Sequence, residues 1–472
     1  MEESVRRKWI IIILSVFSIG SIVAVLNNEY NFYFVAYIWF GFIYGMCLQY
    51  GRFCFSSAFR DLFAVGVPRM VVGVMIATIL FSFVSSFVAA SGMSGFHSAP
   101  FGYHSIIAGL IFGIGMVLAG GCASGSLYKT GEGNGTSLLV VLSLATTLAI
   151  FVDIGGFTNY FVPQKWTESA MSKNLPESLT VNDGWIDQFL AGHVWNLPAT
   201  KISTMLGLNN ESFFGIFLGD FFVGTAVPAV LLLVVVYYFW GRKPHRKRVK
   251  KEKGSEPNFN DDVEGFWAMV ISSKRTSIAG LVLGITAGLH IYVMQGLRVK
   301  FGIENGGTLL RKTGWDSGLS INGTVFDPGY WYVTSQEGQW AAWVMDKLGI
   351  NVMDNIFFGY INGIPNPLVN APGWMSIALI FGAMVIALIH NEFKLKLPTR
   401  ELAVWAILGG FLMGIGSRIG LGCNVGAFFV RTANGDPNGW FFGIGMIGGA
   451  YIGVKFFAWW TERQMAKEMA AF

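Results

Sequence analysis

Three cysteines in this chain share a sequence setting that is suited to chemistry. Cys54 lies in GRFCFSSAFRD, Cys122 in GGCASGSLYKTGEG and Cys423 in GLGCNVGAFF. Each thiol is surrounded by glycine, small hydroxyl or amide residues, and aromatic residues. A lone cysteine in an apolar segment usually only fills space, and we interpret the fourth cysteine, Cys47, in that way. The shared setting of the other three favours a functional role over packing.

Two kinds of chemistry fit cysteines in this setting. Glycine beside each cysteine permits a break in a helix, and the N–H groups that start the next helix attract an anion. The alternative is nucleophilic or redox chemistry, which needs a reactive thiol beside a cation or a second thiol. Lys129, a few residues after Cys122, keeps that alternative open.

The elements that must position these cysteines are membrane helices. The chain has 472 residues, of which 53% are hydrophobic and 13% charged, whereas a soluble domain carries about 25% charged residues. Its mean hydropathy is +0.52. Runs without a charged residue occur at 9–26, 70–91, 105–128, 133–152, 221–241 and 371–389. A helix needs about 20 apolar residues to cross a bilayer, so these runs exclude a soluble enzyme, a nucleic-acid-binding protein and a disordered scaffold.

The runs predict an all-α fold, a polytopic transmembrane bundle. They are continuous rather than alternating, which excludes a β-barrel. We predict spans at 9–26, 32–50, 70–90, 105–121, 136–152, 213–240, 278–297, 373–390, 401–418 and 439–460. The apolar pieces 52–59 and 419–430 are too short to cross and predict re-entrant helices that carry Gly-Cys motifs.

An internal repeat relates two of the three cysteine segments. GLIFGIGMVLAGGCASGS around Cys122 matches GFLMGIGSRIGLGCNVGA around Cys423 at a constant offset of 301 residues (423 − 122). The order of spans has helix 105–121 running inward and helix 401–418 running outward. We therefore predict inverted repeats, with the substrate site near the midplane where the repeats meet.

Glycine pairs with the spacing Gly-x-x-x-Gly recur through the predicted spans. They lie at positions 41/45, 109/113, 280/284, 410/414 and 449/453. Small residues at this spacing let two helix backbones approach closely in lipid. The pairs therefore predict tight helix–helix contacts rather than substrate contacts.

The distribution of Lys and Arg predicts the orientation. Residues 242–253, RKPHRKRVKKEK, follow an apolar run directly, as a cytoplasmic loop does. We interpret them as a topology signal; docking to anionic lipid or to a partner is the alternative. The long segments 153–212 and 298–372 are sparse in Lys and Arg and are predicted to lie outside, which gives a multi-pass inner-membrane protein with both termini in the cytoplasm. The predicted divisions are a first membrane half at 1–240, a basic cytoplasmic linker at 241–276 and a second membrane half at 277–472.

The cysteine segments resemble the YeeE/YedE family of sulfur-transport membrane proteins. The resemblance rests on GRFCF with FRD, then GGCASGSLYKTGEG, then a later Gly-Cys motif, in the order of the thiosulfate-uptake branch. It implies an inverted-repeat transporter that imports thiosulfate, with Cys54, Cys122 and Cys423 as relay residues along a narrow pore. It also implies a small cytosolic sulfur-carrier protein as partner. GCNVGAFF is more similar to the selenium-linked branch, so a selenium compound or another sulfur anion stays an alternative substrate.

The residues are compatible with thiosulfate, a dianion with a soft terminal sulfur. A neutral thiol offers that sulfur a weak S–H donor, whereas a thiolate would repel the dianion. An apolar site keeps a thiol protonated. Weak donors in series bind an anion without trapping it, as conduction requires.

Five further residues are candidates for contact with the anion. They are Lys129, Arg418, Gly121, Gly422 and Asn424. A cation inside a predicted span is a functional candidate, and the alternative for Arg418 is that it extends to the outer interface. Lys129 either meets the anion or marks the cytoplasmic edge. The histidines have no metal spacing, so we expect no metal site, and no P-loop is present, so we expect no direct use of ATP. We read the chain as a transporter without a cofactor and not as an enzyme.

Overall fold

The computed structural model describes residues 2–98, 101–150, 194–197, 200–254, 256–314, 329–331, 333–350 and 367–470. Parts of the predicted segments 153–212 and 298–372 therefore lie outside the described residues. Within the described residues, helices predominate, and two short strands, β1 (Phe101–Gly102) and β2 (Val194–Leu197), pair antiparallel.

Apolar helices long enough to cross a membrane make up most of the described chain. Nine meet that criterion, and α7 is a shorter apolar helix. The main helices of the bundle are α1 (Glu3–Asn27), α2 (Phe32–Gly51), α4 (Arg69–Ala90), α5 (Tyr103–Leu118), the shorter α7 (Gly135–Ile150), α16 (Lys274–Phe301), α19 (Ala371–Ile389), α20 (Arg400–Ile419) and α22 (Asn438–Ala470). A further span runs without interruption through α12 (Phe213–Gly215), η3 (Ile216–Ala226), α13 (Val227–Val236), η4 (Tyr237–Gly241) and α14 (Arg242–Lys253). The predicted polytopic helical bundle is confirmed.

Shorter helices lie between and beside the long ones. Three begin directly after a cysteine: α3 (Phe55–Val65), α6 (Ala123–Gly131) and η6 (Asn424–Val430), a π-helical stretch. The others are η1 (Glu29–Asn31), α11 (Ile202–Met205), α15 (Phe259–Val270), α17 (Gly306–Thr313), α18 (Val333–Lys347), η5 (Pro367–Val369) and α21 (Arg431–Ala433).

Glycine brings the long helices together in pairs. The backbones of α2 and α19 are so close that a Cβ at Gly45 would overlap the carbonyl oxygen of Leu379. A Cβ at Gly109 of α5 would likewise overlap the carbonyl oxygen of Phe442 on α22. Helix α4 contacts α16 through Gly280. The glycine spacing therefore acts as predicted, by removing the side chain where two backbones meet.

Replacing Gly45 with alanine is expected to destabilise the bundle. Its methyl group would meet backbone atoms of α19 that cannot rotate away, and overpacking of this kind costs about 1–3 kcal/mol or more. Thermal unfolding of the detergent-solubilised protein measures the effect. Gly448→Ala is the matched control, because a Cβ at Gly448 of α22 would meet nothing within 4 Å. Equal unfolding temperatures for the two variants would contradict the packing argument.

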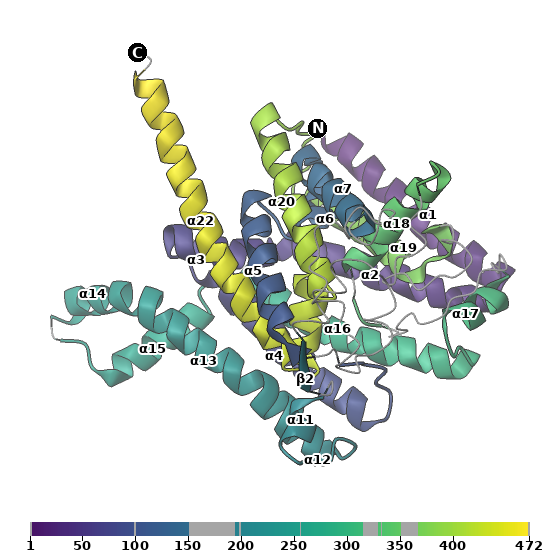
Figure 1. Cartoon of the computed structure of the whole chain (residues 1–472), viewed down its shortest axis with the longest axis horizontal. Coiled ribbons are helices and arrows are strands. Elements are labelled where there is room, and N and C mark those ends of the chain that lie inside the picture. Colours follow the sequence, from purple (N-terminus) through teal and green to yellow (C-terminus); the bar gives the residue numbers. More distant parts are fainter. Residues whose placement is uncertain are drawn as a thin grey trace, which may run out of the picture.

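Two ends of the bundle can be told apart by their charge. The basic end is the end at which Arg52, Lys394 and α14 lie, and the other is called the opposite end. Helices α14 and α15 form a hairpin that projects from the bundle (Figure 1). Asp262 of α15 pairs with Arg246 at 2.6 Å and with Arg242 at 3.1 Å. Hydrogen bonds from these two arginines lower the pKa of the Asp262 carboxyl to about 2, so the hairpin keeps these ion pairs throughout the physiological pH range.

Candidate functional site

The three cysteines predicted to act together occupy the same local position in three segments. Each is the residue before a short helix, with an extended backbone: Cys54 before α3, Cys122 before α6 and Cys423 before η6. All three side chains are buried. The first N–H groups of a helix carry partial positive charge, so each thiol lies at the electropositive start of a helix.

A left-handed residue precedes each of these cysteines and turns the chain. Arg52 has φ 53°, Gly120 has φ 67° and Leu421 has φ 51°. Gly422, with φ 148°, adds a conformation that side chains rarely adopt. Helices α5 and α20 end just before the Gly-Cys motifs, at these residues of positive φ.

The structure brings Cys54 and Cys122 into direct contact. Their sulfur atoms are 3.5 Å apart, although the residues are far apart in the sequence. The Gly125 N–H donates to the Cys122 sulfur at 3.3 Å. A Cβ at Gly125 would lie 2.5 Å from the Cys54 sulfur and 3.1 Å from the Cys122 sulfur. Glycine at this position of α6 is therefore required for the two thiols to share one space.

Cations and carboxylates lie close to the thiol pair in the chain, at the turns before Cys54 and Cys122 and at the end of α6. The Lys129 ammonium group donates to the carbonyl oxygen of Gly120 at 2.7 Å, which holds this cation against the turn before Cys122. Arg52 pairs with Glu132 at 2.9 Å and with Glu392 at 2.8 Å. Lys129 therefore folds back towards the Gly-Cys turn and not towards the surface.

Cys423 is buried near the other two thiols but not in contact with them. Among the described residues, its sulfur has a 3.4 Å contact with the Val425 N–H and none with the Cys54 or Cys122 sulfur. The segments do meet, because the ring of Phe55 packs against Phe428 of η6 with centroids 6.1 Å apart. The three thiols therefore form a contacting pair and a separate single thiol.

The other residues predicted to contact the anion lie close to these cysteines in the sequence. Each is either a buried polar residue or a glycine. Arg418 is 1% exposed, so its side chain lies inside the bundle and not at an interface. Asn424 is fully buried, and neither its amide oxygen nor its amide nitrogen has a hydrogen-bond partner within the described ranges. A Cβ at Gly121 would lie 3.0 Å from the hydroxyl of Ser126. Gly422 provides the turn before Cys423.

Two polar residues near Cys423 were missed by the sequence reasoning. The backbone N–H of Thr334 in α18 lies close enough to influence the Cys423 thiol, and Glu337, one turn further along α18, interacts with that thiol electrostatically. Helix α18 falls in the segment 298–372, which was interpreted only as a long outer segment. A glutamate in VTSQEGQWAAW carries no motif, so only the tertiary structure brings it to the cysteine.

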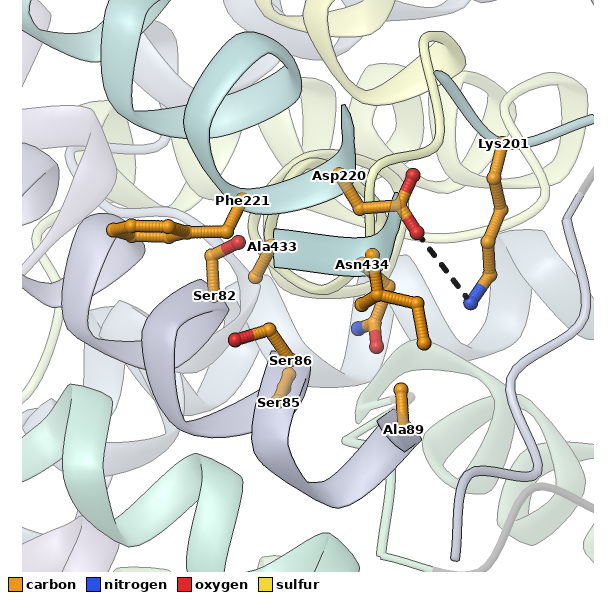
Figure 2. A pocket seen from close by; sticks show the side chains of 10 residues that line it. Ser82, Ser85, Ser86, Ala89, Lys201, Asp220, Phe221, Ala433 and Asn434 are labelled. Carbon is orange, nitrogen blue, oxygen red and sulfur yellow. Dashed lines mark ion pairs between the residues drawn. The ribbon is translucent and has the colours of Figure 1, made fainter. Parts of the chain in front are cut away.

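A cavity with an ion pair lies apart from the cysteines. It is lined by serines of α4 and by Asp220 of η3, and Lys201 lies 3.9 Å from the Asp220 carboxylate (Figure 2). Its volume is about 10 Å³, which is room for roughly one water molecule. The cysteine segments remain the candidate site.

Comparison with known proteins places this arrangement in a family. The family model described as "Sulphur transport" matches residues 50–452, a range that contains all three buried cysteines. The chain belongs to this sulphur-transport family. The YeeE/YedE resemblance of the cysteine motifs is thereby confirmed.

Two relatives are similar to this chain over most of its length, and a third over about a quarter. A thiosulfate transporter, TsuA, from Spirochaeta thermophila is 28% identical over 410 residues, which is 85% of this chain and 92% of that protein. Thiosulfate transporter TsuA from Escherichia coli is 23% identical over 401 residues, 85% of this chain and 88% of that protein. The probable transporter YedE from Escherichia coli is 30% identical over 128 residues, 27% of this chain and 32% of that protein. The family and these relatives are transporters rather than enzymes, which answers the alternative of a thiol enzyme.

Proposed function

We propose that this chain imports thiosulfate through a path along which Cys54, Cys122 and Cys423 bind the anion in turn. The observation that carries the proposal is the contact between two buried thiols, each at the start of a helix, 3.5 Å apart. The family and the full-length relatives named for thiosulfate transport support the same substrate.

The thiol pair has the chemistry that the terminal sulfur of thiosulfate needs. A neutral thiol is a weak S–H donor, and two of them side by side offer the soft sulfur two weak bonds. The N–H groups that start α3 and α6 favour the negative charge. Because each bond is weak, the anion is held long enough to enter but is released again.

The positions of the three thiols between the two ends of the bundle indicate the direction in which the anion would cross. Helix η6 runs from Cys423 to α21, whose end meets α4 and η3 at the opposite end. Helix α6 runs from Cys122 to Glu132, which pairs with Arg52 at the basic end. We propose that the anion enters at the opposite end, meets Cys423, then the thiol pair, and leaves at the basic end. The basic end is then cytoplasmic, in the inner membrane, with both termini there.

The inverted repeat is part of this proposal. Helices α5 and α20 pack on each other through Gly115 and Gly409, and each is followed by a Gly-Cys turn and a short helix. Two such units of opposite direction would place Cys122 and Cys423 on either side of a shared midplane. Close packing of α5 on α20 supports this arrangement.

A small cytosolic sulfur carrier is the proposed recipient. Lys243, Lys247 and Lys251 lie four residues apart on one face of α14 and are exposed. A stripe of this charge attracts an acidic surface. By contrast, Arg242 and Arg246 are paired with Asp262 within the hairpin.

Uptake into proteoliposomes tests the proposed substrate. The purified full chain is reconstituted, and uptake of labelled thiosulfate is compared with uptake of sulfate, sulfite and selenite. Saturable thiosulfate uptake that excess sulfate does not inhibit is the expected result. Equal uptake of sulfate, or selenite uptake without thiosulfate uptake, would contradict the proposal.

A further inference from the structure

The most unusual titratable residue of the described chain is Glu337 of α18. Its side chain is 1% exposed, and neither carboxyl oxygen has a hydrogen-bond partner among the residues that the structure describes. Among the described ion pairs, none includes Glu337. Buried polar groups are nearly always paired, so an unpartnered buried carboxyl calls for an explanation, such as a ligand.

Other unpartnered polar groups gather around the same thiol. The Cys423 sulfur is approached by the Thr334 N–H and lies within the electrostatic reach of Glu337. In the described part of the chain the Thr334 hydroxyl has no hydrogen-bond partner, and its side chain is 1% exposed. The fully buried amide of Asn424 follows Cys423 directly. Within the described residues, three buried side chains from two separate elements therefore have unmet hydrogen bonds, and their elements, α18 and η6, both interact with Cys423.

Glu337 can serve an anion only as a neutral acid. An unpaired carboxylate in such surroundings costs several kcal/mol, so the group holds its proton. The protonated acid has one O–H donor. The Thr334 hydroxyl, the Asn424 amide nitrogen and the Cys423 thiol are donors as well. Together they offer donors without a fixed cation, which suits reversible binding of a dianion with several oxygens.

We propose that protonated Glu337 contacts the substrate directly, donating a hydrogen bond to an oxygen of the anion while Cys423 binds its sulfur. Thr334 and Asn424 complete this subsite. The inference rests on the proposed function, because it assumes that a sulfur oxyanion passes Cys423. It adds to the thiols a set of donors for the oxygen end of the anion, contributed largely by α18. This subsite distinguishes an oxyanion from a bare sulfide.

Kinetics of thiosulfate uptake by reconstituted Glu337 variants test the inference. Losing a hydrogen bond to a charged group weakens binding by roughly ten- to hundredfold. Glu337→Leu is therefore expected to raise the KM for thiosulfate by that factor. Glu337→Gln keeps an uncharged donor of the same shape and should stay within roughly threefold of the wild type. Glu304→Leu, at an exposed glutamate, is the control with unchanged KM.

Folding is measured on the same samples. An apolar side chain removes the burial penalty of the carboxyl, so Glu337→Leu should unfold at no lower temperature than the wild type without anion. Thr334→Val provides a second variant, with a smaller rise in KM expected. An unchanged KM in Glu337→Leu, or a Gln variant as impaired as the Leu variant, overturns the inference alone. Absence of saturable thiosulfate uptake by the wild type overturns the proposed function, and this inference with it.

Discussion

Replacing Cys54 or Cys122 with alanine is expected to reduce thiosulfate uptake to the background level while folded protein remains in the membrane. Each thiol is buried and in contact with the other, 3.5 Å away. Loss of one donor to a charged ligand costs about 1.5–3 kcal/mol. Because the thiols act in series, one missing donor blocks the whole path. Thiosulfate-dependent growth and uptake by proteoliposomes measure the effect.

The fourth cysteine provides the matched control. Cys47 lies on α2 and is only partly buried, and nothing in its setting points to the anion. Cys47→Ala should therefore take up thiosulfate as the wild type does, at equal abundance in the membrane. Cys423→Ala is expected to lose thiosulfate uptake, as Cys54→Ala and Cys122→Ala are. Normal thiosulfate uptake by the Cys54→Ala and Cys122→Ala proteins would show that these thiols are not needed for transport.

A single methyl group at Gly125 is expected to have almost as large an effect. In Gly125→Ala the new Cβ would lie 2.5 Å from the Cys54 sulfur and 3.1 Å from the Cys122 sulfur. One of the thiols must then move away, although neither is replaced. A misplacement of about 1 Å at a reactive site costs on the order of a hundredfold in rate, and a fall of similar size in uptake is expected.

Stability separates this effect from simple misfolding. Alanine favours a helix over glycine by about 1 kcal/mol, so α6 gains intrinsic helix propensity in the Gly125→Ala protein. Gly296→Ala on α16 is the control, because its Cβ would meet only the end of Met93 at 3.8 Å. Uptake is expected to fall in Gly125→Ala and to stay normal in Gly296→Ala. If both transport normally, contact between the two thiols is not needed.

The spans and the Gly-Cys breaks could be predicted from the sequence because both are local properties. A run of apolar residues specifies a membrane helix by its length. Glycine beside Cys122 and Cys423 specifies a turn, and the left-handed residues Gly120 and Gly422 occur where that reasoning places them. The spacing of Gly41 and Gly45 likewise predicted a contact, although not that α19 would be the partner.

The arrangement of the site could not be predicted, because it depends on which helices meet. Nothing in the sequence distinguishes the contacting pair, Cys54 and Cys122, from Cys423. The position of Lys129 against the Gly120 carbonyl oxygen also follows from how α6 folds back on the end of α5. Glu337 was missed for the same reason: its burial comes from the packing of α18 against α7 and α19.

Unpartnered buried side-chain atoms occur in several parts of the described chain, and some of them lie beside Cys423. The unpartnered side chains of Glu337 and Asn424 and the left-handed backbone at Leu421 all cost folding free energy. Unpaired polar groups and unusual backbone conformations are expected where these groups bind a ligand and do not stabilise the fold. Their position around Cys423 is therefore consistent with a path for an anion.

The most direct test of the thiol path is the position of a bound substrate analogue. Selenosulfate carries selenium in place of the terminal sulfur of thiosulfate, so anomalous scattering from crystals of the complex locates that atom. If the anion follows the thiols, we expect a selenium peak in contact with the Cys54 and Cys122 sulfurs or with the Cys423 sulfur. Selenium bound only at Lys201 and Asp220, or elsewhere away from all three thiols, would contradict it.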